Sequence, residues 1–371
     1  MKNKALLVLE DGTVFAGRSC GAPGESFGEA VFHTAMTGYQ EIITDASYMG
    51  QLVAMTYPHI GNYGVIPGDE ESDKPRLAGF IAHEICAKPS NWRSAESLPE
   101  YFRRRGVVAI DGVDTRALTL RLREKGALRG AISTADLDAK SLLAKVLRSP
   151  SLIGADLARA ASCEKAFTWS ERASPQGRRV AVMDFGVKYG ILRRLAALGA
   201  EVRVFPALTP PEEILAAKPD GVVLSNGPGD PAAAAYGARA AKTLAESGVP
   251  VMGICLGHQL LALAFGAKTF KLKFGHHGAN HPVMDLESGR VAVTSQNHGF
   301  GVDAESLPRF LRLTHKSLND GTCEGLAHAE LPVFSLQFHP EASPGPHDAW
   351  SAFARFEALM SRRREASLRH A

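Results

Sequence analysis

From residue 178 onward, short apolar runs alternate with amphipathic stretches, and this alternation limits the possible folds more than any other feature. Strands are predicted for RRVAVMDFG, EVRVFPA, PDGVVLSNGPGDP and VPVMGICLG, and helices for VKYGILRRLAALG, AAAAYGARAAKTLAESG and HQLLALAFG. Strands that alternate with helices are typical of a parallel sheet that is covered on both faces. We therefore predict a doubly wound, mostly parallel α/β domain over residues 178–365.

The first part of the chain has a different pattern, with short β-type runs broken by glycine, such as ALLVLEDGTVFAG and QLVAMTYPHIGNYGV. A later stretch, GVVAIDGVDTRALTLRLREKGALRGAIS, reads as a strand, a helix that begins near Thr115, and another strand. We predict a mixed α/β domain over 1–150. Residues 151–177 are polar with weak periodicity, and we interpret them as a linker.

Charge, cysteine usage and hydropathy exclude several classes of protein. The net charge of +3 on 371 residues, without a basic stripe, argues against a nucleic-acid binder. Five widely spaced cysteines without a CxxC pair fit a reducing compartment. The apolar run after MKNK ends at Glu10 and Asp11, so it reads as a strand rather than a signal peptide, and no segment approaches a membrane span. We expect a cytoplasmic protein without membrane contact.

A single cysteine, Cys255, lies between two glycines where a predicted strand becomes a predicted helix, in GICLG. A nucleophile on a strained strand-to-helix turn needs small neighbours on both sides for the turn to close. The N-terminus of the helix would favour a thiolate and would offer backbone N–H groups to an oxyanion. The alternative is a buried packing cysteine in an ordinary turn, and the pentapeptide alone does not separate the two.

A cysteine nucleophile needs a base, and LQFHPEAS near the end of the chain offers one. His339 follows a predicted strand, and Glu341 lies two residues later, so the carboxylate can hold the far nitrogen of the imidazole. The alternative is a surface pair, because one histidine near one glutamate is common.

Taken together, VMGICLGHQLLALAFG and LQFHPEAS resemble the class I (triad-type) glutamine amidotransferase domain. The resemblance implies that Cys255 is the nucleophile, His339 the general base and acid, and Glu341 the carboxylate that orients the histidine. It also implies that glutamine is bound by Gly227, Gly229, Leu256, Gln259, Asn297, Gly299 and Phe300. Spacing alone leaves Gln259 open as a solvated helix position, although one turn beyond Cys255 it can face the same crevice.

The first half also carries a resemblance. The segments MTGYQEIITDASYMGQLVAMTYPHIGNYG and IDGVDTRALTLRLREKGALRGAI are similar to the N-terminal domain of the carbamoyl phosphate synthetase small subunit. With DFGVKYGILRRL, SNGPGDP and KFGHHGANHPV, the resemblance covers nearly the whole chain. It implies that Ser47 helps to hold glutamine. An amidotransferase that serves another acceptor is the alternative.

This resemblance also implies a hetero-oligomer. A large synthetase subunit would accept the ammonia, and ATP and magnesium would bind to that subunit, so we expect no cofactor in this chain. No GxxxxGK[ST] motif occurs in the sequence. The carbamoyl phosphate formed would feed pyrimidine and arginine biosynthesis.

Two further clusters have interpretations that compete. His276, His277 and His281 lie in HHGANHP without an acidic or cysteine ligand at suitable spacing, so we expect a loop near the active site and no metal. PHIGNYG, with His59 and Asn62, could be a catalytic loop, but a structural turn or a subunit contact is the preferred interpretation.

Overall fold

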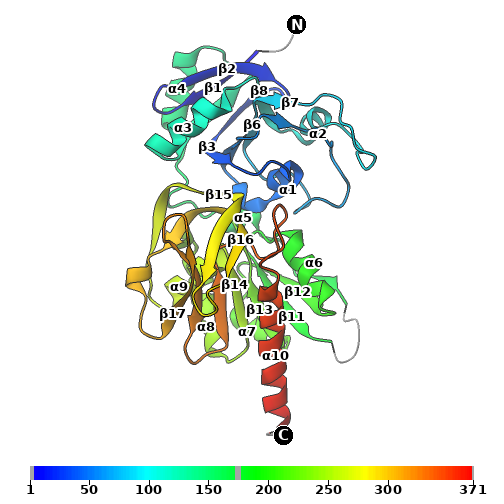
Figure 1. The fold of residues 1–371 in the computed structure, drawn as a ribbon, viewed down its shortest axis with the longest axis vertical. Coiled ribbons are helices and arrows are strands. Elements are labelled where there is room, and N and C mark those ends of the chain that lie inside the picture. The colour runs from blue at the N-terminus through cyan, green and yellow to red at the C-terminus, as the bar shows by residue number, and fades with distance from the viewer. Residues whose placement is uncertain (1–3, 172–176, 370–371) are drawn as a thin grey trace. The chain divides into compact units, whose positions relative to one another are not determined.

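The chain forms two compact units in a computed structural model that describes residues 4–171 and 177–369 (Figure 1). The first unit contains the chain up to Ile153 together with Lys273–Gly278, and the second contains Gly154–Leu272 and the chain from Ala279 onward. Each unit has its own apolar core.

The first unit is built on a closed barrel in the strand order β1-β2-β8-β6-β4-β3-β9. The barrel mixes antiparallel pairs, such as β1 with β2, and parallel pairs, such as β3 with β4. Its strands are β1 (Lys4–Leu9), β2 (Val14–Ser19), β3 (Glu25–His33), β4 (Gln51–Met55), β6 (Gly79–Ile81), β8 (Val108–Asp111) and β9 (Leu128–Ser133). A small separate sheet pairs β5 (His59–Ile60) with β7 (Glu84–Ile85).

The helices of the first unit are α1 (Tyr39–Thr44), α2 (Leu98–Arg105), α3 (Thr115–Lys125) and α4 (Ala139–Arg148). The predicted helix start at Thr115 is confirmed, because the Asp114 carboxylate accepts a hydrogen bond from the N–H of Ala117 and caps α3. Leu118 and Leu122 of α3 are buried in one cluster with β1 and β3 residues. The mixed α/β prediction for this part is thus confirmed, whereas closure into a barrel was not predicted.

The second unit contains a ten-stranded sheet in the order β10-β12-β11-β13-β14-β19-β18-β17-β15-β16. Strands β12, β11, β13, β14 and β19 are parallel to one another, and the remaining strands add antiparallel pairs at both edges. The strands are β10 (Phe167–Ser170), β11 (Arg179–Asp184), β12 (Glu201–Pro206), β13 (Gly221–Leu224), β14 (Val251–Ile254), β15 (Thr269–Asp285), β16 (Val291–Val302), β17 (Leu311–Ser317), β18 (Cys323–His328) and β19 (Val333–Leu336).

Helices cover both faces of the parallel part of this sheet, as the sequence predicts (Figure 1). The helices are α5 (Ala158–Ala161), α6 (Tyr189–Ala197), α7 (Pro211–Ala216), α8 (Ala235–Glu246), α9 (Leu256–Ala264) and α10 (Ser351–Arg369). Apolar side chains of α6 and α10 pack on one face, for example Ile191 and Phe356 against Val182. Those of α7, α8 and α9 pack on the other face, with Leu260 against Leu224.

The segment predicted as a linker, 151–177, differs from the prediction. It contributes α5 and β10, and β10 pairs with β12 as an edge strand of the large sheet. The prediction failed because Phe167–Ser170 is half-exposed and therefore lacks the apolar pattern of a central strand. The part of the segment from 172 to 176 lies outside the described residues.

The HHGANHP segment is also different from the expected loop. It lies inside the 17-residue strand β15, where His276 and His277 are buried in the strand rather than placed on a turn. PHIGNYG contributes only the two-residue strand β5, which pairs with the equally short strand β7. Across this pair Nδ1 of His59 lies 3.8 Å from Oε2 of Glu84, which fits a structural turn. Among the described residues, the helices are too short or too polar to cross a membrane.

Candidate active site

Cys255 lies on a sharp turn between β14 and α9. Its backbone has φ of 52° and ψ of −104°, a left-handed conformation that a residue with a side chain rarely adopts. The side chain is buried, and its thiol is 3.5 Å from the carbonyl oxygen of Asn297. Strain of this kind is concentrated at functional positions, so the turn favours the nucleophile interpretation over a packing cysteine.

The glycines on either side of Cys255 are required by close backbone contacts. A Cβ atom on Gly253 would lie 2.7 Å from the carbonyl oxygen of Gly257, and one on Gly257 would lie 2.1 Å from that of Leu224. Any side chain at these two positions would therefore push α9 away from β13 or β14. The glycine pattern in the sequence is thus explained by how tightly the helix turns back over the sheet.

His339 and Glu341 form a buried pair. Nδ1 of His339 is 2.7 Å from Oε1 of Glu341, and both side chains are almost fully buried. Nε2 of His339 makes no well-formed hydrogen bond among the described residues, so this nitrogen is available for proton transfer. The surface-pair alternative is therefore wrong.

Sheet pairing brings Cys255 and His339 to the same end of the sheet, beyond two adjacent parallel strands. Ile254 of β14 pairs with Leu336 of β19, and the N–H of Cys255 donates to the carbonyl of Leu336 over 2.8 Å. Cys255 follows the carboxyl end of β14, and His339 follows that of the adjacent parallel strand. Ligands of open α/β sheets bind outside such carboxyl ends, which is where both side chains lie.

Lys188 is a buried member of this site that sequence reasoning did not single out. Its ammonium group donates to Oε1 of Glu341 over 2.9 Å and to the carbonyl of Ala342 over 2.6 Å. It lies directly before α6, in the connection that follows the carboxyl end of β11. The signal available in DFGVKYG was a lysine at a strand-to-helix turn that ends a buried strand, where a solvated surface lysine is not expected.

The charges of the three groups depend on one another. Burial opposes ionisation of Glu341, but Lys188 and His339 outweigh it and lower the pKa of that carboxyl. Burial likewise opposes charge on His339, but the carboxylate of Glu341 outweighs it and raises the pKa of the imidazole, with a smaller contribution from the nearby Cys255 thiol. The site therefore favours a protonated His339 beside Cys255 at neutral pH.

Several residues predicted to bind glutamine lie near the turn. Leu256 is the first residue of α9, so its N–H has no partner within the helix. Gly227 follows β13 at the same sheet edge, and a Cβ atom there would lie 2.2 Å from the carbonyl of Phe185. Gly229 has φ of 94° and packs against the backbone of Ala155. The structure thus requires glycine at both positions.

The other predicted pocket residues come from α9 and β16. The side-chain amide of Gln259 donates to the carbonyl of Phe300 over 2.8 Å and to Gln337 over 3.0 Å, so it joins α9 to β16 and is not the solvated position left open by spacing. The Phe300 ring faces the ammonium of Lys271 at 4.9 Å. Asn297 and Gly299 lie on the same strand.

Ser47 belongs to the first unit. It lies in the 3-10 turn Ala46–Tyr48, is nearly buried, and donates its N–H to the Asp45 carboxylate over 2.8 Å. Its role in holding glutamine stays a prediction, as do the roles of the other pocket residues.

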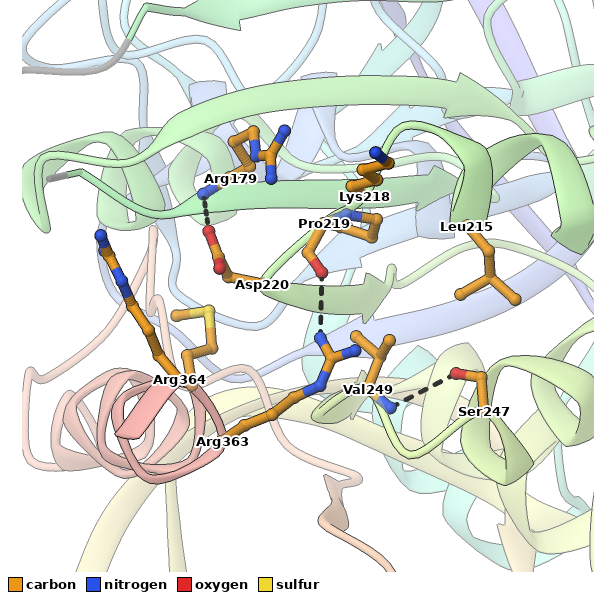
Figure 2. Close-up of a pocket in the computed structure, with 10 residues that line it drawn as sticks. Arg179, Leu215, Lys218, Pro219, Asp220, Ser247, Val249, Arg363 and Arg364 are labelled. Atoms are coloured by element: carbon orange, nitrogen blue, oxygen red, sulfur yellow. Dashed lines mark hydrogen bonds between the residues drawn. The ribbon is translucent and has the colours of Figure 1, made fainter. Parts of the chain in front are cut away.

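A cavity lies at the end of the sheet opposite to Cys255, where β11 and β13 begin (Figure 2). Its volume is about 480 Å³, and four basic side chains line it: Arg179, Lys218, Arg363 and Arg364. Figure 2 shows the Asp220 carboxylate accepting from the N–H of Arg179 at 2.7 Å and Arg363 donating to the carbonyl of Pro219 at 3.2 Å. This basic cavity is at the amino ends of the strands, away from Cys255.

Comparison with known proteins agrees with this geometry. Residues 181–359 match the family model for class-I glutamine amidotransferase, and residues 7–132 match that for the carbamoyl-phosphate synthase small chain, CPSase domain. A carbamoyl phosphate synthase small chain from Syntrophotalea carbinolica is 50% identical over 374 residues, covering 98% of this chain and 99% of that protein.

Two other relatives have the same name and similar coverage. The Thioalkalivibrio sulfidiphilus protein is 53% identical over 367 residues, covering 96% of this chain and 97% of its own length. The Xanthomonas axonopodis protein is 51% identical over 390 residues, covering 98% of this chain and all of its own length. With half of all residues identical from end to end, this chain belongs to the carbamoyl phosphate synthase small chain family.

Proposed function

We propose that this chain hydrolyses glutamine through Cys255, His339 and Glu341 and supplies the ammonia to a large synthetase subunit. The observation that carries the proposal is the left-handed turn at Cys255, which lies at the same end of the sheet as the buried His339–Glu341 pair. A strained cysteine at a helix start, next to a histidine held by a carboxylate, is the arrangement that nucleophilic acyl transfer needs.

The first half-reaction forms a thioester. The Cys255 thiolate attacks the side-chain amide carbon of glutamine, and the carbonyl oxygen becomes an oxyanion. The N–H groups of Leu256 and Gly229 are the proposed donors to that oxyanion. Protonated His339 then gives its Nε2 proton to the amide nitrogen, the C–N bond breaks, and ammonia leaves.

The second half-reaction restores the enzyme. Neutral His339 takes a proton from water, and the resulting hydroxide attacks the thioester carbon, so that the C–S bond breaks and glutamate is released with Cys255 as thiolate. Glu341 keeps Nδ1 of His339 in its hydrogen bond throughout, which fixes Nε2 toward the reacting atoms. Lys188 keeps Glu341 ionised and in place.

The acceptor follows from the family. We propose that a large subunit uses ATP, with magnesium, and bicarbonate to make carboxyphosphate. Ammonia then displaces the phosphate to form carbamate, and a second ATP phosphorylates the carbamate to carbamoyl phosphate for pyrimidine and arginine biosynthesis. Ammonia would pass between the subunits in a path shielded from water, because free ammonia is protonated at neutral pH. Cytoplasmic location fits such a pathway.

Labelling with 6-diazo-5-oxo-L-norleucine, a glutamine analogue with an electrophilic carbon, tests the nucleophile. We expect one covalent adduct on Cys255, protection by glutamine, and no adduct in Cys255→Ser. Cys163→Ser, which changes a half-buried cysteine of the same unit, is the matched control and should label like the wild type. An adduct on another cysteine, or none on the wild-type chain, would remove the proposed triad.

A further inference from the structure

The basic cavity has a backbone framework that joins three elements of the second unit. The N–H of Arg179, the first residue of β11, donates to the carboxylate of Asp220, which directly precedes β13. From α10, the guanidinium of Arg363 donates to the carbonyl of Pro219 (Figure 2). The segments that carry the basic side chains are therefore fixed to one another by hydrogen bonds.

The charge on the walls of this cavity is unbalanced. Four cations line it, Arg179, Lys218, Arg363 and Arg364, whereas Asp220 is the one carboxylate among its lining residues. The carboxyl ends of α7 and α8 also reach the cavity, and each adds at most about half a negative charge. The cations therefore exceed the negative charges by about two, so compensation of the helix ends explains only part of the cluster.

Two of the cations have donors that no neighbouring group uses. Among the described residues, neither the guanidinium of Arg179 nor the ammonium of Lys218 makes a hydrogen bond or an ion pair. Lys218 is exposed and Arg179 is partly exposed, so a ligand can reach both from solvent. The apolar lining residues Met360 and Val249 belong to the core and are almost fully buried. Recognition here therefore depends on charge and hydrogen bonds rather than on apolar contact.

We propose that the basic cavity binds a dianionic phosphate group, either inorganic phosphate or the phosphate of a small phosphate ester. A phosphate group carries about two negative charges near neutral pH, which matches the excess of positive charge. The planar guanidinium of Arg179 can donate to two phosphate oxygens at once, and Lys218 adds a point charge. The proposal does not depend on glutamine hydrolysis, because the cavity lies away from Cys255 and binding is measured directly.

Isothermal titration of the full chain with inorganic phosphate at low ionic strength, at about pH 8 where phosphate is dianionic, tests the site. We expect saturable binding of one phosphate per chain. Arg179→Met should weaken binding by roughly ten- to a hundredfold, the range for hydrogen bonds to a charged group. Arg309→Met, which removes an exposed cation of the same unit outside the cavity, should bind like the wild type.

A second variant separates loss of charge from a disturbed fold. Asp220→Asn removes the carboxylate from the cavity but keeps an oxygen that can accept from the N–H of Arg179. Because every cation stays in place, this variant should bind phosphate severalfold more tightly than the wild type. A disturbed fold cannot produce such a gain, and binding no tighter than that of the wild type would contradict the charge argument.

Titration with other anions identifies the ligand class. Acetate, a monoanion, should bind much more weakly than phosphate. Tighter binding of glycerol 3-phosphate than of inorganic phosphate assigns the cavity to a phosphate ester, and weaker binding assigns it to free phosphate. The absence of saturable binding of either compound, equal binding by Arg179→Met and the wild type, equal loss in Arg309→Met, or acetate binding as strong as that of phosphate would each overturn the proposed site.

Discussion

Replacing Glu341 with glutamine keeps the shape of the side chain and removes the charge that two buried cations face. In the native site Oε1 of Glu341 accepts from Lys188 at 2.9 Å and from His339 at 2.7 Å. His339 can adapt by losing its proton, because burial itself favours the neutral ring. Lys188 cannot adapt so easily, since its ordinary pKa lies far above neutrality.

The structure therefore predicts unequal costs for the two sides of the pair. Glu341→Gln should lower the free energy of unfolding by about 3–5 kcal/mol, the range for a buried ion left without its partner. Lys188→Met should cost less, about 1–3 kcal/mol, because Glu341 keeps His339 and the loss resembles that of hydrogen bonds to a charged group. In the double variant the costs should fall short of additivity by about 1–3 kcal/mol.

Urea unfolding of the four proteins, followed by tryptophan fluorescence, measures this cycle. Trp169 and Trp350 both lie in the unit that contains the site. The conservative variant Glu341→Asp is a useful control, since it keeps the charge but shortens the reach and should recover part of the lost stability. Additive costs, or a Lys188→Met variant less stable than Glu341→Gln, would refute the proposed charge coupling.

Three further perturbations have defined outcomes. Gly257→Ala should lower the free energy of unfolding by roughly 1–3 kcal/mol, because the new Cβ would lie 2.1 Å from the carbonyl oxygen of Leu224. Gly266→Ala is the control: its Cβ would meet no atom within 4 Å, so it reports only the cost of a left-handed backbone. Burial lowers the pKa of His258 from 6.5 to about 3. The unfolded chain therefore binds the proton more tightly than the folded one, and the free energy of unfolding should decrease as pH is lowered below 6.5, by about 2 kcal/mol at pH 5. His258→Asn, which can still bond Ser335, should flatten that slope in urea titrations. The lowered pKa of Glu341 stabilises the fold above pH 4.5, and this contribution is lost as pH falls below that value. Glu341→Gln should therefore make the free energy of unfolding less dependent on pH below 4.5.

The sequence predicted the parallel part of the second unit well because strand and helix periodicities differ strongly there. The position of Cys255 between its glycines and the spacing of His339 and Glu341 were also visible, since local backbone needs determine both. Closure of the first unit into a barrel was not visible, because strand pairing between distant segments leaves no local periodicity. The half-exposed strand β10 was mistaken for a linker for a similar reason.

Lys188 shows the limit of motif reasoning most clearly. The lysine lies 153 residues from Glu341 in the chain, and only the packing of β11 beside β13 and β14 brings the two charges together. Charge partners across a sheet are decided by topology, whereas a turn or a cap is decided by neighbours in the chain.

The central claim is that Cys255 delivers ammonia from glutamine to a partner synthetase. The most direct measurement is carbamoyl phosphate formation by this chain co-expressed with its large subunit, given ATP, magnesium and bicarbonate, with either glutamine or ammonia as the nitrogen source. Cys255→Ser should abolish formation from glutamine and leave formation from ammonia intact. Formation from glutamine at the wild-type rate in Cys255→Ser would contradict the account.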